Sequence, residues 1–144
     1  MLNCCNIIDV ISSLPDVYMK GSTSEDKINA MEEELDVIFS EEYRRYILAY
    51  SQASYKRADG SRIDITGDVS PTNGKDVRYQ TELLRGIYGS LVKDMYVVIS
   101  LHPEHGTLLQ NCSGDIYSVN TEHGINTLQH VALSLSAVIS KDCT

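Results

Sequence analysis

The pattern of apolar and polar residues predicts two helices in tandem between residues 24 and 50. Ser24 can cap the first helix and Ser40 the second, because a hydroxyl accepts a hydrogen bond from an early backbone amide. Apolar residues follow each cap at helical spacing: Ile28, Met31 and Leu35 after the first, and Tyr43, Tyr46, Ile47 and Tyr50 after the second. Residues 37–39 break this period and join the two helices by an extended connection.

Three further helices are predicted from the same spacing. Residues 4–14 form a first helix, which ends before Pro15 because a proline keeps its predecessor out of the α region. Residues 79–91 form a short helix despite Gly86 and Gly89. A closing helix is predicted from a cap at Asn126 or Thr127, and its apolar face consists of Leu128, Val131, Ala132, Leu135, Val138 and Ile139.

The strongest strand signal lies at residues 95–101, where both alternating faces are mostly apolar, as in a central strand covered on both sides. Ile63 and Ile65 alternate with charged residues in a second, half-exposed strand. Residues 107–110 and 116–119 form a hairpin around a turn at residues 111–115, and residues 67–76 form a surface loop. Helices, then a meander, then a helix predict an α+β fold of one domain, with a mostly antiparallel sheet packed on one side by the N-terminal helices and the C-terminal helix.

The residues of the tandem helices resemble a known family pattern. Their order resembles the opening motif of the SUKH superfamily, and it consists of Ile28, Glu32, Leu35, an apolar triplet ending at Phe39, Glu42 with Tyr43, and then Tyr46 and Ile47. The usual motif has Gly where this chain has Asp36, Leu-Pro in place of Phe39 and Ser40, and Asn-Gly in place of Ser51 and Gln52. The second half of the chain is similar to the family pattern at three places: Tyr96 to Val98, Gly114 to Tyr117, and Val131, Ala132 and Leu135.

The resemblance covers roughly residues 22–140, so the helix at residues 4–14 is an addition to a family core within one domain of residues 1–144. The superfamily contains bacterial immunity proteins of polymorphic toxin systems and fungal cell-wall assembly regulators. The resemblance therefore implies a non-enzymatic protein that binds a cognate protein toxin. The alternative is an intracellular regulatory scaffold, whose relatives tend to carry long disordered extensions that this chain does not have.

Charge narrows the class of partner. The net charge is −8, and residues 25–44 contain eight carboxylates and two basic residues, a net charge of −6. Nucleic-acid binding depends largely on Lys and Arg, so direct binding to nucleic acid is disfavoured. An acidic surface of this kind either keeps the protein soluble or faces a basic partner such as a nuclease toxin.

Tyrosine is the other sign of recognition, because it offers a large rigid contact area with a polar tip. The chain has nine tyrosines, one phenylalanine and no tryptophan. Tyr43, Tyr46 and Tyr96 are expected in the core. The predicted partner-binding residues combine the acidic stretch with two tyrosines: Glu32, Glu33, Asp36, Glu41, Glu42, Tyr55 and Tyr79.

The sequence contains no recognisable catalytic or cofactor motif, so neither a cofactor nor a metal ion is predicted. His102 and His105 lie in a short turn between two strands, where histidines are expected to face solvent. A small metal-dependent hydrolase that uses both histidines and a carboxylate is the least favoured alternative. The four cysteines show no disulfide or metal spacing and are expected to be reduced.

The cellular location of the protein is inferred from the length of its apolar segments. No apolar segment approaches the roughly 20 residues that cross a bilayer. The first 15 residues also lack the basic leader and long apolar segment of a secretory signal. We therefore expect a cytoplasmic protein that is not attached to a membrane.

Overall fold

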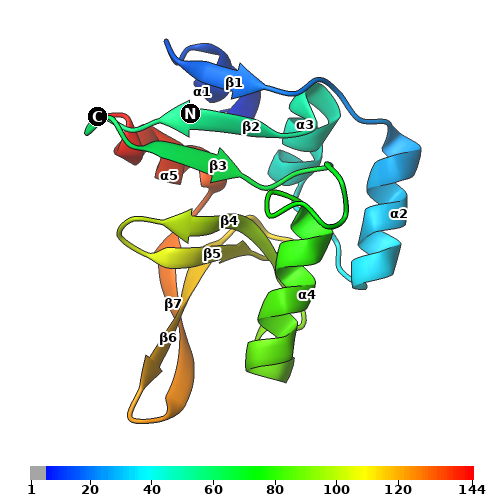
Figure 1. The fold of residues 1–144 in the computed structure, drawn as a ribbon, viewed down its shortest axis with the longest axis vertical. Helices are drawn as coiled ribbons and strands as arrows, with labels where there is room; N and C mark the ends of the chain where they lie inside the picture. Colours follow the sequence, from blue (N-terminus) through cyan, green and yellow to red (C-terminus); the bar gives the residue numbers. More distant parts are fainter. Residues whose placement is uncertain (1–5) are drawn as a thin grey trace.

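A meandering sheet of seven strands forms the centre of the computed structural model, which describes residues 6–144 (Figure 1). The strands lie in the sheet in the same order as in the chain, and neighbouring strands are antiparallel throughout. Their bounds are β1 Val17–Met19, β2 Ala53–Lys56, β3 Arg62–Ile65, β4 Tyr96–His102, β5 Gly106–Gln110, β6 Ile116–Glu122 and β7 Ile125–Ala132. This arrangement confirms the predicted α+β fold with an antiparallel sheet.

The helices begin where polar side chains satisfy their first amides. The hydroxyl of Ser24 accepts a hydrogen bond from the N–H of Lys27, and that of Ser40 accepts one from the N–H of Tyr43, which confirms both predicted starts. The helices of the described residues are α1 Ile7–Ser12, α2 Glu25–Leu35, α3 Glu41–Tyr50, α4 Val77–Tyr88, the 3₁₀ helix η1 Gly89–Val92 and α5 Leu135–Asp142. None of them is long and apolar enough to span a membrane.

Strand β4 separates two apolar clusters. Its Val98 belongs to the main core, together with buried side chains from α1, α2, α3 and α5. Val97 points to the other face and packs with Leu84 of α4 and Leu109 of β5. The N–H of Val97 also donates to the hydroxyl of Thr81 on α4 at 3.0 Å. The prediction of a strand covered on both sides is confirmed, and α4 is a helix on the second face of the sheet, beyond the single helical layer that was predicted.

The predicted closing helix is wrong over its first half. Residues Ile125–Ala132 are not helical but form β7, which pairs with β6 along its whole length. A two-residue turn at His123 and Gly124, both with positive φ, closes this hairpin. The apolar spacing of residues 128–132 is compatible with a helix or with a strand. The segment forms a strand because the turn brings it beside β6, with which it pairs. The helix begins only at α5, where the Ser134 hydroxyl accepts from the N–H of Ala137.

The N-terminal elements differ from the prediction in detail. Helix α1 is shorter than the predicted residues 4–14, begins after Asn6 and ends before Pro15. Cys4 and Cys5 lie outside the described residues. Strand β1 falls in a segment predicted to be a connection, and β2 was not predicted, because strands of three and four residues are too short to show alternation. The separation of a core at residues 22–140 from an added helix stays a prediction.

Candidate partner-binding surface

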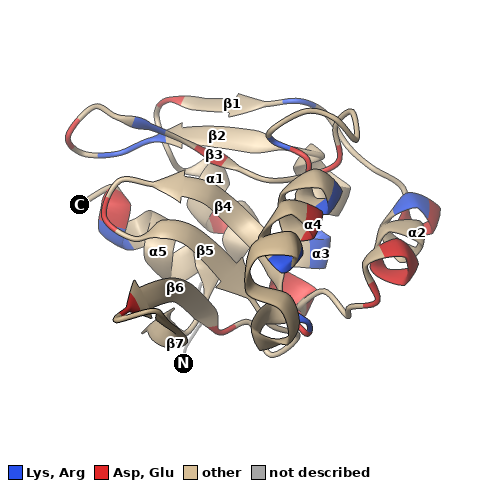
Figure 2. Cartoon of the chain, turned by 60° about the horizontal axis from the view of Figure 1, so that its bottom comes forward, with Lys and Arg blue, Asp and Glu red and all other residues tan. Residues whose placement is uncertain are grey.

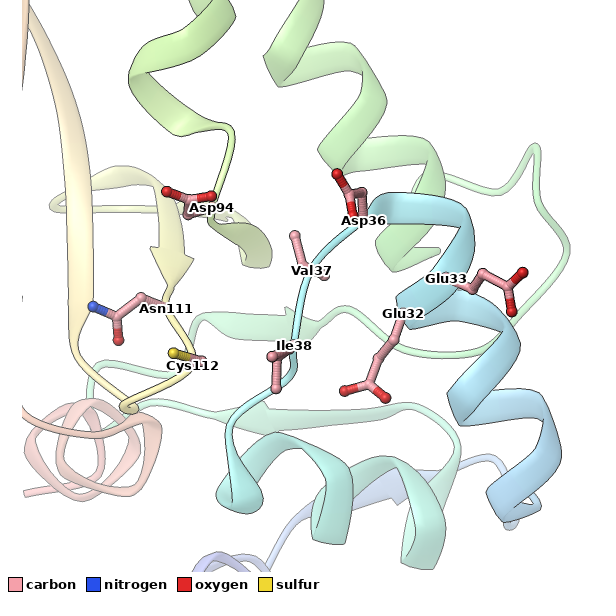
Figure 3. A pocket seen from close by; sticks show the side chains of 8 residues that line it. All are labelled: Glu32, Glu33, Asp36, Val37, Ile38, Asp94, Asn111 and Cys112. Carbon is pink, nitrogen blue, oxygen red and sulfur yellow. The ribbon is translucent and has the colours of Figure 1, made fainter.

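A groove of about 680 Å³ opens beside the end of α2 (Figure 3). Two parts of the chain line it. One side is formed by the end of α2 and the segment after it, with Glu32, Glu33, Asp36, Val37 and Ile38. The other side is formed by Asp94 after η1 and by Asn111 and Cys112 in the turn between β5 and β6. The fold thus places three predicted partner-binding residues beside residues that lie far away in the sequence.

Ile38 is the apolar centre of this groove. The segment between α2 and α3 is extended, so successive side chains point to opposite sides. Val37 and Phe39 are buried at 9% and 2% exposure, whereas Ile38 is 70% exposed. A single exposed apolar residue is ordinary, but this one lies between the carboxylates of α2 and the turn that carries Asn111.

The carboxylates at the end of α2 lie at a position that is unfavourable for the helix. A helix C-terminus carries partial negative charge and favours basic residues, yet the last turn of α2 has no basic residue and contains Glu32, Glu33 and Glu34. Asp36 follows in the left-handed conformation, with φ of 54° and ψ of 48°. Figure 2 shows how acidic residues gather along α2.

Glu33, Asp36 and Asp94 also lack internal partners among residues 6–144. All three are exposed. No ion pair of the described residues includes any of them. These three carboxylates therefore present an uncompensated negative charge around the groove.

Glu32 has a different role from its neighbours. One carboxylate oxygen accepts a hydrogen bond from Arg44 Nη1 at 2.6 Å, and the other accepts one from the N–H of Phe39 at 2.8 Å. Arg44 also contacts Glu25 and Asn29 on α2. Glu32 therefore connects α2 to α3 and fixes the extended segment that exposes Ile38.

Two further predicted partner-binding residues, besides Glu32, prove to be structural. Tyr55 is 1% exposed, and its hydroxyl donates to Asp142 at 2.6 Å, so its predicted place at an interface is wrong. Glu42 is half-buried and caps the start of α5, where its carboxylate accepts hydrogen bonds from the N–H groups of Leu135 and Ser136 at 2.7 and 3.0 Å. We therefore leave Tyr55 and Glu42 out of the proposed interface.

The remaining two predicted residues are exposed but lie apart from the groove. Glu41 pairs with Arg45 one turn along α3, at 2.6 Å. Tyr79 lies on α4 and is 39% exposed. Neither lines the groove.

Sequence reasoning missed Ile38, Asp94 and Asn111. For Ile38 a signal was present, because alternation along an extended connection would have placed it opposite Val37 and Phe39. Asp94 and Asn111 gave no signal, since only the packing of η1 and of the β5–β6 turn brings them to α2.

A second cavity, of about 470 Å³, contains the histidines of the hydrolase alternative. The possible ligand atoms of His102, Glu104 and Asp142 lie within 4.8 Å of one another. His102 is 2% exposed, so the expectation that it faces solvent is wrong. Its Nδ1 accepts from the N–H of Glu104 at 3.2 Å, which places the ring hydrogen on Nε2, 3.0 Å from both oxygens of Asp142.

Hydrogen bonds and ion pairs already engage these groups. Arg57 contacts both carboxylates, with Nη2 2.5 Å from Glu104 and Nε 3.4 Å from Asp142. The Tyr55 hydroxyl donates to Asp142, and burial, followed by this carboxylate, raises the pKa of Tyr55 well above its usual value. A guanidinium beside both carboxylates opposes a cation there. The cluster is best understood as a polar network that holds the end of α5 against β2 and β4.

Comparison with known proteins gives one family. A family model described as SUKH_5, SMI1-KNR4 cell-wall, matches residues 6–133. This match includes every strand of the sheet and all residues that line the groove. No protein among the curated ones matches the chain.

Proposed function

Because the chain belongs to the SUKH family, of the SMI1-KNR4 kind, we propose that it is a non-enzymatic immunity protein that binds a cognate protein toxin and neutralises it by covering its working surface. The observation that carries this proposal is the groove beside α2. Glu33, Asp36 and Asp94 form no ion pair with the described residues, they line the same groove as the exposed Ile38, and two of them stand at a helix end that disfavours negative charge.

The groove indicates the chemistry of the partner. Carboxylates without internal partners attract Lys and Arg, and an apolar residue among them can act as an anchor once water is excluded. A toxin that cleaves nucleic acid has a basic cleft for its substrate, which matches this surface in sign. A basic protein surface, with a nuclease as the favoured case, is therefore the proposed partner.

Co-expression with the product of the adjacent upstream gene tests the function directly. We expect the chain to protect the cells from that product and to be purified with it as a stable complex. Loss of both protection and complex would reject the proposal.

A matched pair of substitutions tests the groove. Ile38→Ser removes its apolar centre and is expected to weaken the complex by about tenfold or more, as at other buried anchors. Ile87→Ser is the control, because Ile87 on α4 is exposed to a similar extent, 67% against 70%, and does not line the groove. Equal effects of both substitutions would place the interface elsewhere.

A regulatory scaffold of the cell-wall assembly type is the second candidate, because the description of the matching family names the cell wall. It predicts no protection against any toxin. The hydrolase alternative is tested by metal analysis of the purified chain. Stoichiometric zinc that is lost in His105→Ala would reject a non-enzymatic protein.

A further inference from the structure

The two edges of the sheet differ in their protection against pairing. An exposed edge strand offers unpaired N–H and C=O groups to another strand, and proteins usually protect it by short length, charge or proline. Edge strand β1 has three residues and follows Asp16, which forms ion pairs with Arg62 and Lys56. The opposite edge, β7, has eight residues and contains no Asp, Glu, Lys, Arg or Pro.

The lack of charge extends beyond the strand. Residues 123–140 contain no Asp, Glu, Lys or Arg, although the whole chain has 32 such residues. Two copies with a net charge of −8 each repel one another when their acidic surfaces meet. On β7 itself a second copy meets no Asp, Glu, Lys or Arg side chain.

We propose that β7 pairs with β7 of a second copy of this chain, antiparallel and about a two-fold axis, so that the two sheets become one. In such a pair the start of one strand lies beside the end of the other. Ile125 and Leu133, which are 65% and 76% exposed, stand at these two ends. Each would cover apolar surface of the other copy, and no register within the strand brings like charges together.

The shape of the molecule leaves room for this contact. The turn end of the β6–β7 hairpin extends beyond the rest of the sheet (Figure 1). Most of β7 is exposed and the described residues place no strand on its outer side. An interface limited to one strand and its two flanking apolar residues is small, so the dimer should be weak and dependent on concentration.

Sedimentation velocity of the full chain over a series of concentrations tests the dimer. The key variant is Thr127→Asp, because Thr127 is exposed on β7 and Asp adds a like charge from each copy and disfavours a strand. Thr72→Asp makes the same change at an exposed position, in the loop at residues 67–76, and is the control. We expect the wild type and the control to dimerise alike, and Thr127→Asp to need about tenfold higher concentration or more.

Amide hydrogen exchange of the wild type gives a second readout, which does not depend on the folding of a variant. The amides of β7 should become more protected as concentration rises, while those of β1 stay unchanged. A chain that remains monomeric at every concentration, or a dimer that Thr127→Asp leaves unaltered, would overturn the proposal. Protection of β7 only in a complex with the toxin would overturn it too, in favour of a strand supplied by that partner.

Discussion

Carboxylates of the same acidic stretch affect the fold in opposite ways: Glu42 stabilises it, whereas Glu33 and Asp36 do not. At the junction of α3 and α5, Glu42 accepts hydrogen bonds from two backbone amides, the Ser136 hydroxyl and the Gln110 side chain. At the end of α2, Glu33 and Asp36 have no ion-pair partner among the described residues and oppose the helix dipole. Residues of one type and one stretch can thus be structural in one place and available to a partner in another.

The difference shows which acidic residues are informative about function. A carboxylate that satisfies backbone amides is explained by the fold, whereas one that weakens its own helix needs another reason to be there.

The fold should lose stability at alkaline pH, because four tyrosines are buried in it. Burial is the first cause that raises the pKa of Tyr43, Tyr46, Tyr55 and Tyr96 above the ordinary value. Above about pH 10 the unfolded chain releases these protons and the folded chain keeps them, so stability falls as pH rises. Tyrosinate absorbance of these four residues should appear only together with loss of the circular dichroism of the fold. Their ionisation in a still folded chain would contradict this.

Removing the cap of α5 should cost roughly 2 to 4 kcal/mol of unfolding free energy. Glu42→Ala leaves the N–H groups of Leu135 and Ser136 without their charged acceptor. Glu41→Ala is the control, because its exposed pair with Arg45 contributes about 0.5 kcal/mol or less. Urea unfolding of both variants measures the difference. Equal costs would mean that Glu42 is as dispensable as its neighbour.

Asp36→Gly should separate stability from binding. Gly adopts the left-handed conformation of residue 36 without strain and removes a charge from the helix end, so we expect a gain of about 0.5 to 1 kcal/mol. The same change should slow association with the toxin. Asp36→Asn is the matched control, since it removes the charge and keeps a side chain that tolerates this conformation. A less stable Gly variant would show that Asp36 has a structural role.

Glu33→Gln should have the smallest effect on stability, a gain of about 0.3 to 0.5 kcal/mol at low salt that disappears at high salt. Its measure is again urea unfolding, now at two salt concentrations. A loss of stability would place Glu33 with Glu42 among the structural carboxylates.

Much of the fold follows from local sequence signals. The caps at Ser24 and Ser40, the two-sided apolar pattern of β4 and the turn residues between β5 and β6 each act over a few neighbouring residues. The β7 strand could not be predicted in this way, because its apolar spacing fits a helix equally well. Its pairing with β6, which lies outside any local pattern, makes it a strand. The short strands β1 and β2 likewise depend on their neighbours.

The sequence predicted the negative charge of the candidate surface better than it predicted which residues form that surface. Concentrated acidity indicated residues 25–44, a stretch that includes the end of α2, where the groove lies. Composition could not show that Glu42 caps a helix more than 90 residues later, or that Tyr55 is held by Asp142. Such contacts depend on the packing of α5 against β2 and α3, which no local pattern records.

The association rate of the toxin with Glu33→Lys, measured at low and at high salt, shows whether the groove carboxylates attract the partner. Glu122→Lys is the control, with the same change of charge on the exposed hairpin, away from the groove. If the groove carboxylates serve the partner, Glu33→Lys slows association at low salt well beyond the control, and high salt reduces the difference. Equal association rates for the two variants at low salt would contradict the claim and leave the acidity of α2 as a solubilising surface.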